Sequence, residues 1–154
     1  MQTLEHRLSG RLSTLAADDR GRTLLQLALR GISAGEHGLT AACWTDHGGA
    51  GCLFQHAYWQ GAREGVFEDR GRPAEWIGGL VGPQLFGEVI GAIDSFDRLA
   101  KVRYADREHR WLRRDRIRIR QDEWRTAVDG MLVDVLARVS PAPDDAGQAS
   151  APVR

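Results

Sequence analysis

The chain has 154 residues and a formal charge of zero, since 21 lysines and arginines balance 21 aspartates and glutamates. Its 42% hydrophobic and 27% charged residues form an ordinary globular mixture, and the length suits a single domain. A neutral chain has no overall attraction for nucleic acid or anionic lipid, so binding of either would need a local patch.

The expected compartment is the cytoplasm. The N-terminal residues lack the basic region and unbroken apolar run of an export signal. The longest apolar stretch, residues 76–87, contains Pro83 and is shorter than the ~20 residues of a membrane span. We therefore expect no membrane partner, and two cysteines that are thiols or metal ligands rather than a disulfide.

Two amphipathic helices are predicted first. Over about residues 2–16 leucines recur at helical spacing, namely Leu4, Leu8, Leu12 and Leu15. Asp18 and Asp19 can accept the first amide protons of a second helix. Gly31 and Gly35 mark its end, because glycine tolerates a left-handed cap.

The middle of the chain alternates glycine-rich and helical segments. Residues 33–51 are predicted to be irregular, with a turn at 48–51. A helix should begin near Cys52 and run toward Gly65, and Pro73 suits the first residue of a short helix.

A long helix is predicted from Pro83 to about residue 102, with apolar residues at spacings of three and four. Gly87 and Gly91 lie one turn apart on it. Their missing side chains predict a close crossing with another helix, in preference to a ligand contact.

The C-terminal third contains three segments for which the predicted structure differs. Residues 115–120 alternate arginine with apolar or acidic residues, which favours a strand, although a loop or helix extension fits equally well. Residues 121–139 carry one apolar face and predict the last helix. Residues 141–154 lack the apolar content to fold, so we expect a disordered tail. The overall prediction is an all-α domain at residues 1–140, a compact bundle of about five or six helices.

The main candidate site is a cysteine–histidine pattern, C-x3-H-x4-C-x3-H, formed by Cys43, His47, Cys52 and His56. Each pair is four residues apart, which on a helix places both side chains on one face. A glycine turn joins the pairs, and two thiolates with two imidazoles suit tetrahedral zinc. We take a zinc site with a regulatory or interaction role as the leading functional hypothesis, with a protein partner or a second copy as binding partner.

For the same four residues, a structural role is favoured over metal binding. Cysteine is among the most buried residue types, and both cysteines lie beside apolar neighbours. The spacing matches none of the common zinc motifs, and a chain of this length needs no metal to form a core.

A second alternative makes Cys52 an enzyme nucleophile. A thiol at a helix N-terminus is activated, because the helix dipole favours negative charge there. His47, His56 or His109 could act as the base, with Asp46 orienting it.

A third alternative is nucleic-acid binding by residues 103–125. This segment holds nine arginines against five acids, a local charge of +4, with Tyr104, Trp111 and Trp124 interleaved. The arginines that would contact a nucleic acid are Arg113, Arg114, Arg116, Arg118 and Arg120. A solvated surface of internal ion pairs is the favoured interpretation, because every basic residue except Lys101 is arginine and the acids lie close by.

Two pairs of acids at short spacing complete the candidates. They are Glu64 with Glu68 and Asp94 with Asp97. Carboxylates from facing helices can bind two metals, but such sites use Glu-x-x-His elements that the sequence lacks. We therefore expect these four acids to lie on solvated faces.

Overall fold

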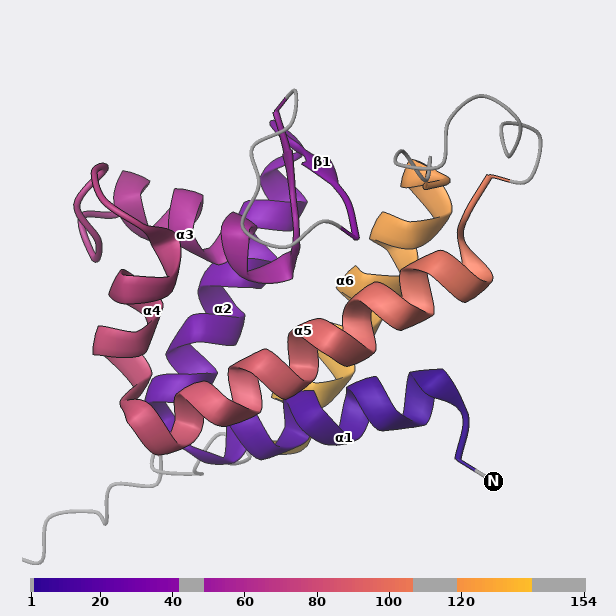
Figure 1. Ribbon diagram of the computed structural model, residues 1–154, viewed down its shortest axis with the longest axis horizontal. Coiled ribbons are helices and arrows are strands. Elements are labelled where there is room, and N and C mark those ends of the chain that lie inside the picture. The colour runs from indigo at the N-terminus through magenta and orange to yellow at the C-terminus, as the bar shows by residue number, and fades with distance from the viewer. Residues whose placement is uncertain (1, 42–48, 107–118, 140–154) are drawn as a thin grey trace, which may run out of the picture.

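The protein is mostly helical in the computed structural model, which describes residues 2–41, 49–106 and 119–139. These ranges contain six helices, so the predicted compact helical fold is confirmed (Figure 1). The helices are α1 (Leu4–Ala17), α2 (Asp19–Ala34), α3 (Leu53–Arg63), α4 (Pro73–Val81), α5 (Pro83–Arg103) and α6 (Gln121–Val139). The predicted disordered tail lies outside the described residues, and the domain boundary at residue 140 stays a prediction.

Local sequence signals account for most helix starts. The Asp18 carboxylate caps α2 by accepting from the backbone amides of Arg20 at 2.8 Å and Gly21 at 3.4 Å. Hydrogen bonds from the side chain and backbone of Arg20 hold the pKa of Asp18 below its ordinary value. Pro73 and Pro83 occupy the first turns of α4 and α5, where the absent N–H removes no helical hydrogen bond.

One hydrophobic core joins all six helices. In Figure 1, α5 runs across the front of the molecule, with α1 below it. Helix α2 lies behind α5, between α1 and the region of α3 and β1. The largest side chains with no solvent exposure are Trp124, Phe54 and Phe96, and the Phe96 and Trp124 rings lie 4.7 Å apart. Within the described ranges, no helix has the length and apolar character needed to cross a membrane.

The close helix crossing lies at a different glycine from the ones predicted. A Cβ on Gly87 would meet nothing within 4 Å, and one on Gly91 would meet the Arg11 guanidinium at 3.0 Å rather than a backbone. A Cβ on Gly31 would lie 2.5 Å from the backbone oxygen of His56, so α2 and α3 make the backbone-to-backbone contact. Gly31 is therefore an interior packing residue of α2, and only Gly35, with φ of 71°, serves as its cap.

Part of the segment predicted to be irregular forms a short parallel strand pair. Strands β1 (Gly38–Leu39) and β2 (Ala50–Gly51) pair with Gly38 opposite Ala50. The Gln121 side chain from α6 completes the hydrogen bonding of Leu39, accepting from its N–H at 2.8 Å and donating to its carbonyl at 2.7 Å. Residues distant in sequence satisfy this backbone, which is why the local composition did not predict it.

Candidate functional site

The structure describes two of the four predicted zinc ligands. Cys52 and His56 lie at the start of α3, whereas Cys43 and His47 fall outside the described residues. Cys52 is the N-cap of α3 in an extended conformation, with a side chain 0% exposed. The rule that residues four apart share a helix face therefore does not apply to Cys52, because this residue precedes the helix.

His56 is a buried histidine held by backbone groups. It is 1% exposed, and its Nε2 lies 2.9 Å from the carbonyl oxygen of Gly38. Because a carbonyl oxygen can only accept, Nε2 carries the proton and donates this bond. Burial lowers the pKa of His56 below its ordinary value, and the carbonyls of Gly38 and Gly31 partly oppose that shift. To bind a metal through Nε2, His56 would have to give up its bond to β1.

Cys52 lies near a carboxyl group that the sequence analysis assigned to a solvated face. Asp97 of α5 is partly buried, and its Oδ1 has no hydrogen-bond partner among the described residues. Burial is the main cause that raises the pKa of Asp97 to about 7; the nearby Cys52 and Asp94 also raise this pKa, and Lys101 opposes the shift. Asp97 is therefore not a solvated acid, unlike Asp94, whose side chain is 73% exposed.

The structure describes only some of the residues that make up the predicted metal and thiol sites. Within the described ranges, no three Cys, His, Asp or Glu side chains come together in a group that could hold a metal ion. The four-ligand site itself is untested, because Cys43 and His47 lie outside those ranges. So do Asp46, the orienting residue of the thiol-enzyme hypothesis, and His109, one of its three alternative bases.

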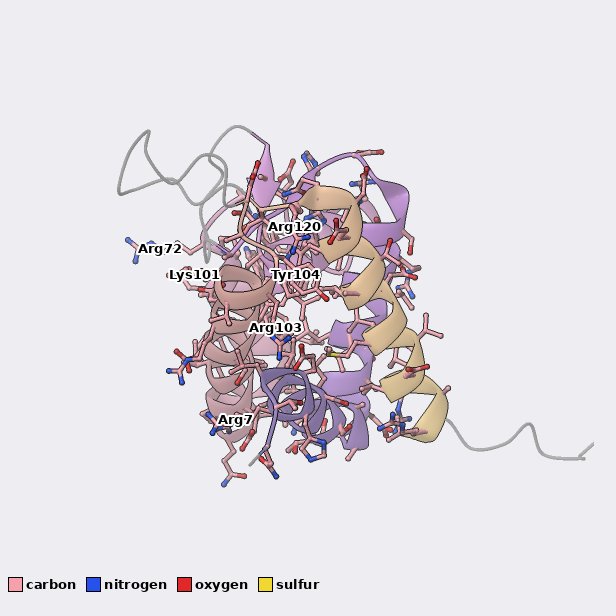
Figure 2. All side chains as sticks on the ribbon, turned by 90° about the vertical axis from the view of Figure 1, so that its right-hand side faces the viewer. Arg7, Arg72, Lys101, Arg103, Tyr104 and Arg120 are labelled. Atoms are coloured by element: carbon pink, nitrogen blue, oxygen red, sulfur yellow. The ribbon has the colours of Figure 1, made fainter. Side chains whose placement is uncertain are left out.

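The arginine-rich segment is described only at its two ends. An antiparallel bridge between Ala105 and Ile119 joins these ends, and Figure 2 shows Arg103, Tyr104 and Arg120 together on this face. Arg120 pairs with Glu123 at 2.7 Å, and its guanidinium carbon lies 5.8 Å from the Tyr104 ring centroid.

Internal contacts also engage the other described arginines of this segment. Arg103 lies 3.7 Å from Glu5, and Arg125 donates to the backbone carbonyls of His37 and Ile32. Arg125 is therefore a structural residue. Arg113, Arg114, Arg116 and Arg118 lie outside the described residues, so the nucleic-acid alternative stays a prediction.

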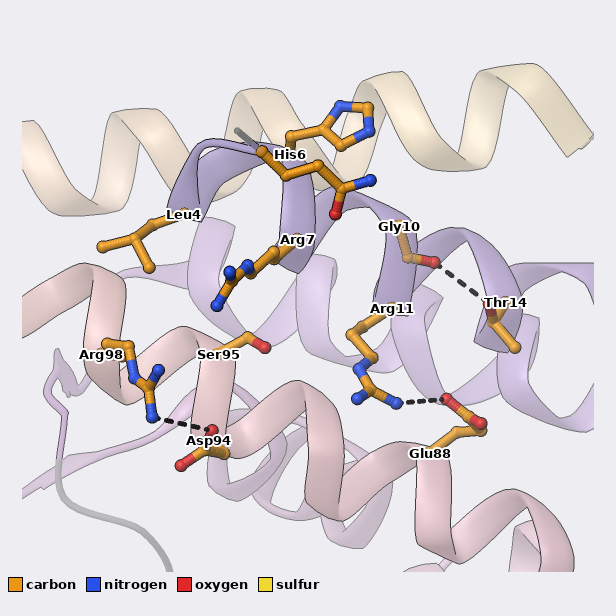
Figure 3. A pocket seen from close by; sticks show the side chains of 11 residues that line it. Leu4, His6, Arg7, Gly10, Arg11, Thr14, Glu88, Asp94, Ser95 and Arg98 are labelled. Carbon is orange, nitrogen blue, oxygen red and sulfur yellow. Dashed lines mark hydrogen bonds and ion pairs between the residues drawn. The ribbon is translucent and has the colours of Figure 1, made fainter.

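A groove between α1 and α5 has a volume of about 550 Å³. Arg7 and Arg11 line it from α1, while Ser95 and Arg98 line it from α5. Figure 3 shows the Arg7 side chain reaching from α1 toward Ser95, between the other two guanidinium groups. The volume lies within the ~300–1,000 Å³ range of small-molecule sites.

Two carboxylates in the α1–α5 groove compensate part of its positive charge. Arg11 Nη1 lies 3.2 Å from Glu88 Oε2, and Arg98 Nη2 lies 3.8 Å from Asp94 Oδ2. Arg7 has no carboxylate at ion-pair distance among the residues that the structure describes. The groove therefore holds three guanidinium groups against two carboxylates, and the uncompensated cation is Arg7.

Gly91 sets the position of Arg11 on the wall of the groove. A Cβ at Gly91 would lie 3.0 Å from the Arg11 guanidinium carbon, so the guanidinium lies directly over this glycine. The missing side chain leaves room for the Arg11 guanidinium to pair with Glu88, and Figure 3 shows this pair. Gly91 thus serves side-chain placement, in contrast to the backbone crossing predicted for it.

The sequence did not indicate the arginines of the groove; of the groove residues that carry charge, only Asp94 was considered, as a solvated acid. Arg7 and Arg11 are spaced one turn apart on the polar side of α1, as are Asp94 and Arg98 on α5, but this spacing is common on exposed helices. Only the packing of α1 against α5 brings the two sets together. No protein-family model, curated protein or solved structure matches the chain. Its function therefore has to be inferred from its own side chains.

Proposed function

We propose that the protein binds a small anionic ligand in the α1–α5 groove. The observation that carries this proposal is the convergence of Arg7, Arg11 and Arg98 on one concave surface, with Arg7 lacking a carboxylate partner among the described residues. Guanidinium groups bind carboxylates and phosphates through paired, charge-assisted hydrogen bonds. The Ser95 hydroxyl beside Arg7 adds a neutral donor for an anion's oxygen.

A phosphate titration of Arg7→Ala tests this proposal. Inorganic phosphate should raise the Tm of the wild-type protein at low ionic strength, because a ligand that binds only the folded state stabilises it. Arg7→Ala should weaken phosphate binding about five-fold, since an exposed charged contact contributes about 1 kcal/mol. The measurement is thermal unfolding across a phosphate series, with Kd confirmed by isothermal titration calorimetry.

Arg72→Ala is the matched control, since it removes the same charge outside the groove. Arg72 precedes α4, at the opposite end of the molecule from the start of α1 (Figure 1), and lies well apart from Arg7 in Figure 2. It should leave the phosphate affinity unchanged. Equal losses in both variants would mean general charge attraction and would contradict a site in the groove.

The zinc site is a second candidate function, favoured by one observation. Asp97 Oδ1 is a buried acceptor with no partner among the described residues, and it lies near Cys52. Thiolates and carboxylates are both zinc ligands, so Asp97 adds a possible ligand type to Cys43, His47, Cys52 and His56.

Zinc content measures this second candidate directly. Protein purified from zinc-supplemented growth should contain about one equivalent of zinc, because a closed structural site binds the ion tightly. Cys52→Ala should lose the metal, whereas His6→Ala, which removes an exposed imidazole in α1, should keep it. Zinc far below one equivalent in the wild-type protein would rule this candidate out.

A further inference from the structure

The α1–α5 groove contains acceptors as well as cations, and this mixture restricts the ligand. Glu88 contacts Arg11 through Oε2, and Asp94 contacts Arg98 through Oδ2 at the longer distance of 3.8 Å. The Asp94 side chain is 73% exposed, and the described residues give Oδ1 no hydrogen bond. Asp94 therefore has an oxygen available to a ligand at the edge of the groove.

Asp94 is next to the proposed anion position. It directly precedes Ser95, and Figure 3 shows its carboxylate paired with Arg98 and lying below Ser95, on the other side of Ser95 from Arg7. A ligand with negative charge alone would place that charge near the Asp94 carboxylate, and like charges repel. A ligand that also carries a positive group would turn this repulsion into an ion pair.

Resting on the function proposed above, we infer that the ligand is a zwitterion, a phosphate monoester that also carries an ammonium group. The phosphate contacts Arg7, Ser95 and Arg98, and the ammonium donates to Asp94. A short carbon chain between the two charged groups suits this arrangement, because Asp94 and Ser95 are adjacent on α5. Discrimination then comes from the charge pattern of the groove rather than from its net charge.

Two matched probes separate charge pattern from net charge. O-phosphoethanolamine carries the ammonium, and propyl phosphate replaces it with a methyl group of similar size. Net charge alone would favour propyl phosphate, which is the more negative at pH 8. The zwitterion proposal predicts the reverse, with O-phosphoethanolamine binding about three-fold more tightly, as suits an exposed ion pair.

Asp94→Asn should change the two affinities in opposite directions. It should weaken O-phosphoethanolamine by removing its ion pair, and strengthen propyl phosphate by removing a repulsion. Glu75→Gln, an exposed acid in α4 away from the groove, is the control and should alter neither affinity. The measurement is calorimetric Kd for both probes, with circular dichroism confirming that each variant is folded.

Each of the other outcomes would reject the zwitterion proposal, the role of Asp94 or anion binding itself. Propyl phosphate binding the wild-type protein as tightly as O-phosphoethanolamine would overturn the zwitterion proposal and leave anion binding standing. A preference that persists in Asp94→Asn would remove Asp94 as the ammonium partner. Failure of both probes and of inorganic phosphate to bind would refute the proposed function itself.

Discussion

Asp97→Asn is expected to stabilise the metal-free protein at pH 8, raising its Tm by about 5 °C, which corresponds to about 2 kcal/mol for a chain of this size. The pKa of Asp97 is about 7 in the folded protein, against an ordinary value of 3.8. Between these two values the folded state holds a proton that the unfolded chain has already lost, and at pH 8 the folded state carries a partly buried, ionised carboxylate. Conversion of the whole pKa shift into a free energy of unfolding would give a larger value. Asp97 is partly in contact with solvent, which reduces the effect.

The pH dependence fixes the sign of the Asp97 effect. Below about pH 4 both states are protonated, and the carboxyl contributes its full share of stability. Between about pH 4 and 7 only the unfolded state loses the proton, so folding stability falls, and above pH 7 the loss is complete. Asp97→Asn should thus match the wild type near pH 4 and exceed it progressively up to pH 7.

Chemical denaturation of EDTA-treated protein from pH 4 to 8 measures this difference. Glu75→Gln, which removes an exposed carboxylate from α4, is the control and should give no comparable pH-dependent gain. Destabilisation of the metal-free protein by Asp97→Asn at pH 8 would show that a partner stabilises the Asp97 carboxylate, which would contradict its raised pKa.

Gly31→Ala is expected to destabilise the protein by about 2 kcal/mol, as overpacking does in rigid interiors. Its Cβ would lie 2.5 Å from the His56 carbonyl oxygen, and this neighbour is backbone that cannot rotate away. Relief requires α2 and α3 to separate, which would loosen the buried side chains between them. Thermal and urea unfolding measure the loss of stability.

Gly87→Ala is the matched control within a helix. A Cβ there meets nothing within 4 Å, so the substitution should stabilise α5 by about 0.5 to 1 kcal/mol through the higher helix propensity of alanine. Opposite signs for the two substitutions would confirm that the close crossing lies at Gly31. A neutral Gly31→Ala, or a large loss at Gly87→Ala, would place the close contact elsewhere.

The helices were predictable because their signals are local. Apolar spacing placed the last helix at residues 121–139, the bounds of α6, and Asp18 and Pro73 marked helix starts correctly. The crossing glycine was not predictable, since Gly31 and Gly91 both lie inside helices and only the path of a second helix distinguishes them. The strand pair at β1 and β2 depends likewise on Gln121, which is 82 residues from Leu39.

The candidate sites, like the fold, were predictable only where the sequence signal is local. The spacing of Cys52 and His56 indicated a shared face only if both residues were helical, and Cys52 instead occupies the N-cap position before the helix. The burial of the Asp97 side chain depends on the position of α5 against α3. The residues next to Asp97 in the sequence do not indicate this position. The α1–α5 groove joins residues about 90 positions apart, such as Arg7 and Arg98, so no local pattern could reveal it.

A residue-by-residue map of amide chemical shifts during a phosphate titration would test anion binding in the groove most directly. We expect saturable shifts concentrated in residues 6–14 of α1 and 88–98 of α5, with the rest of the described chain nearly unmoved. Shifts centred on another surface, or a spectrum unchanged at high phosphate, would contradict anion binding in the groove.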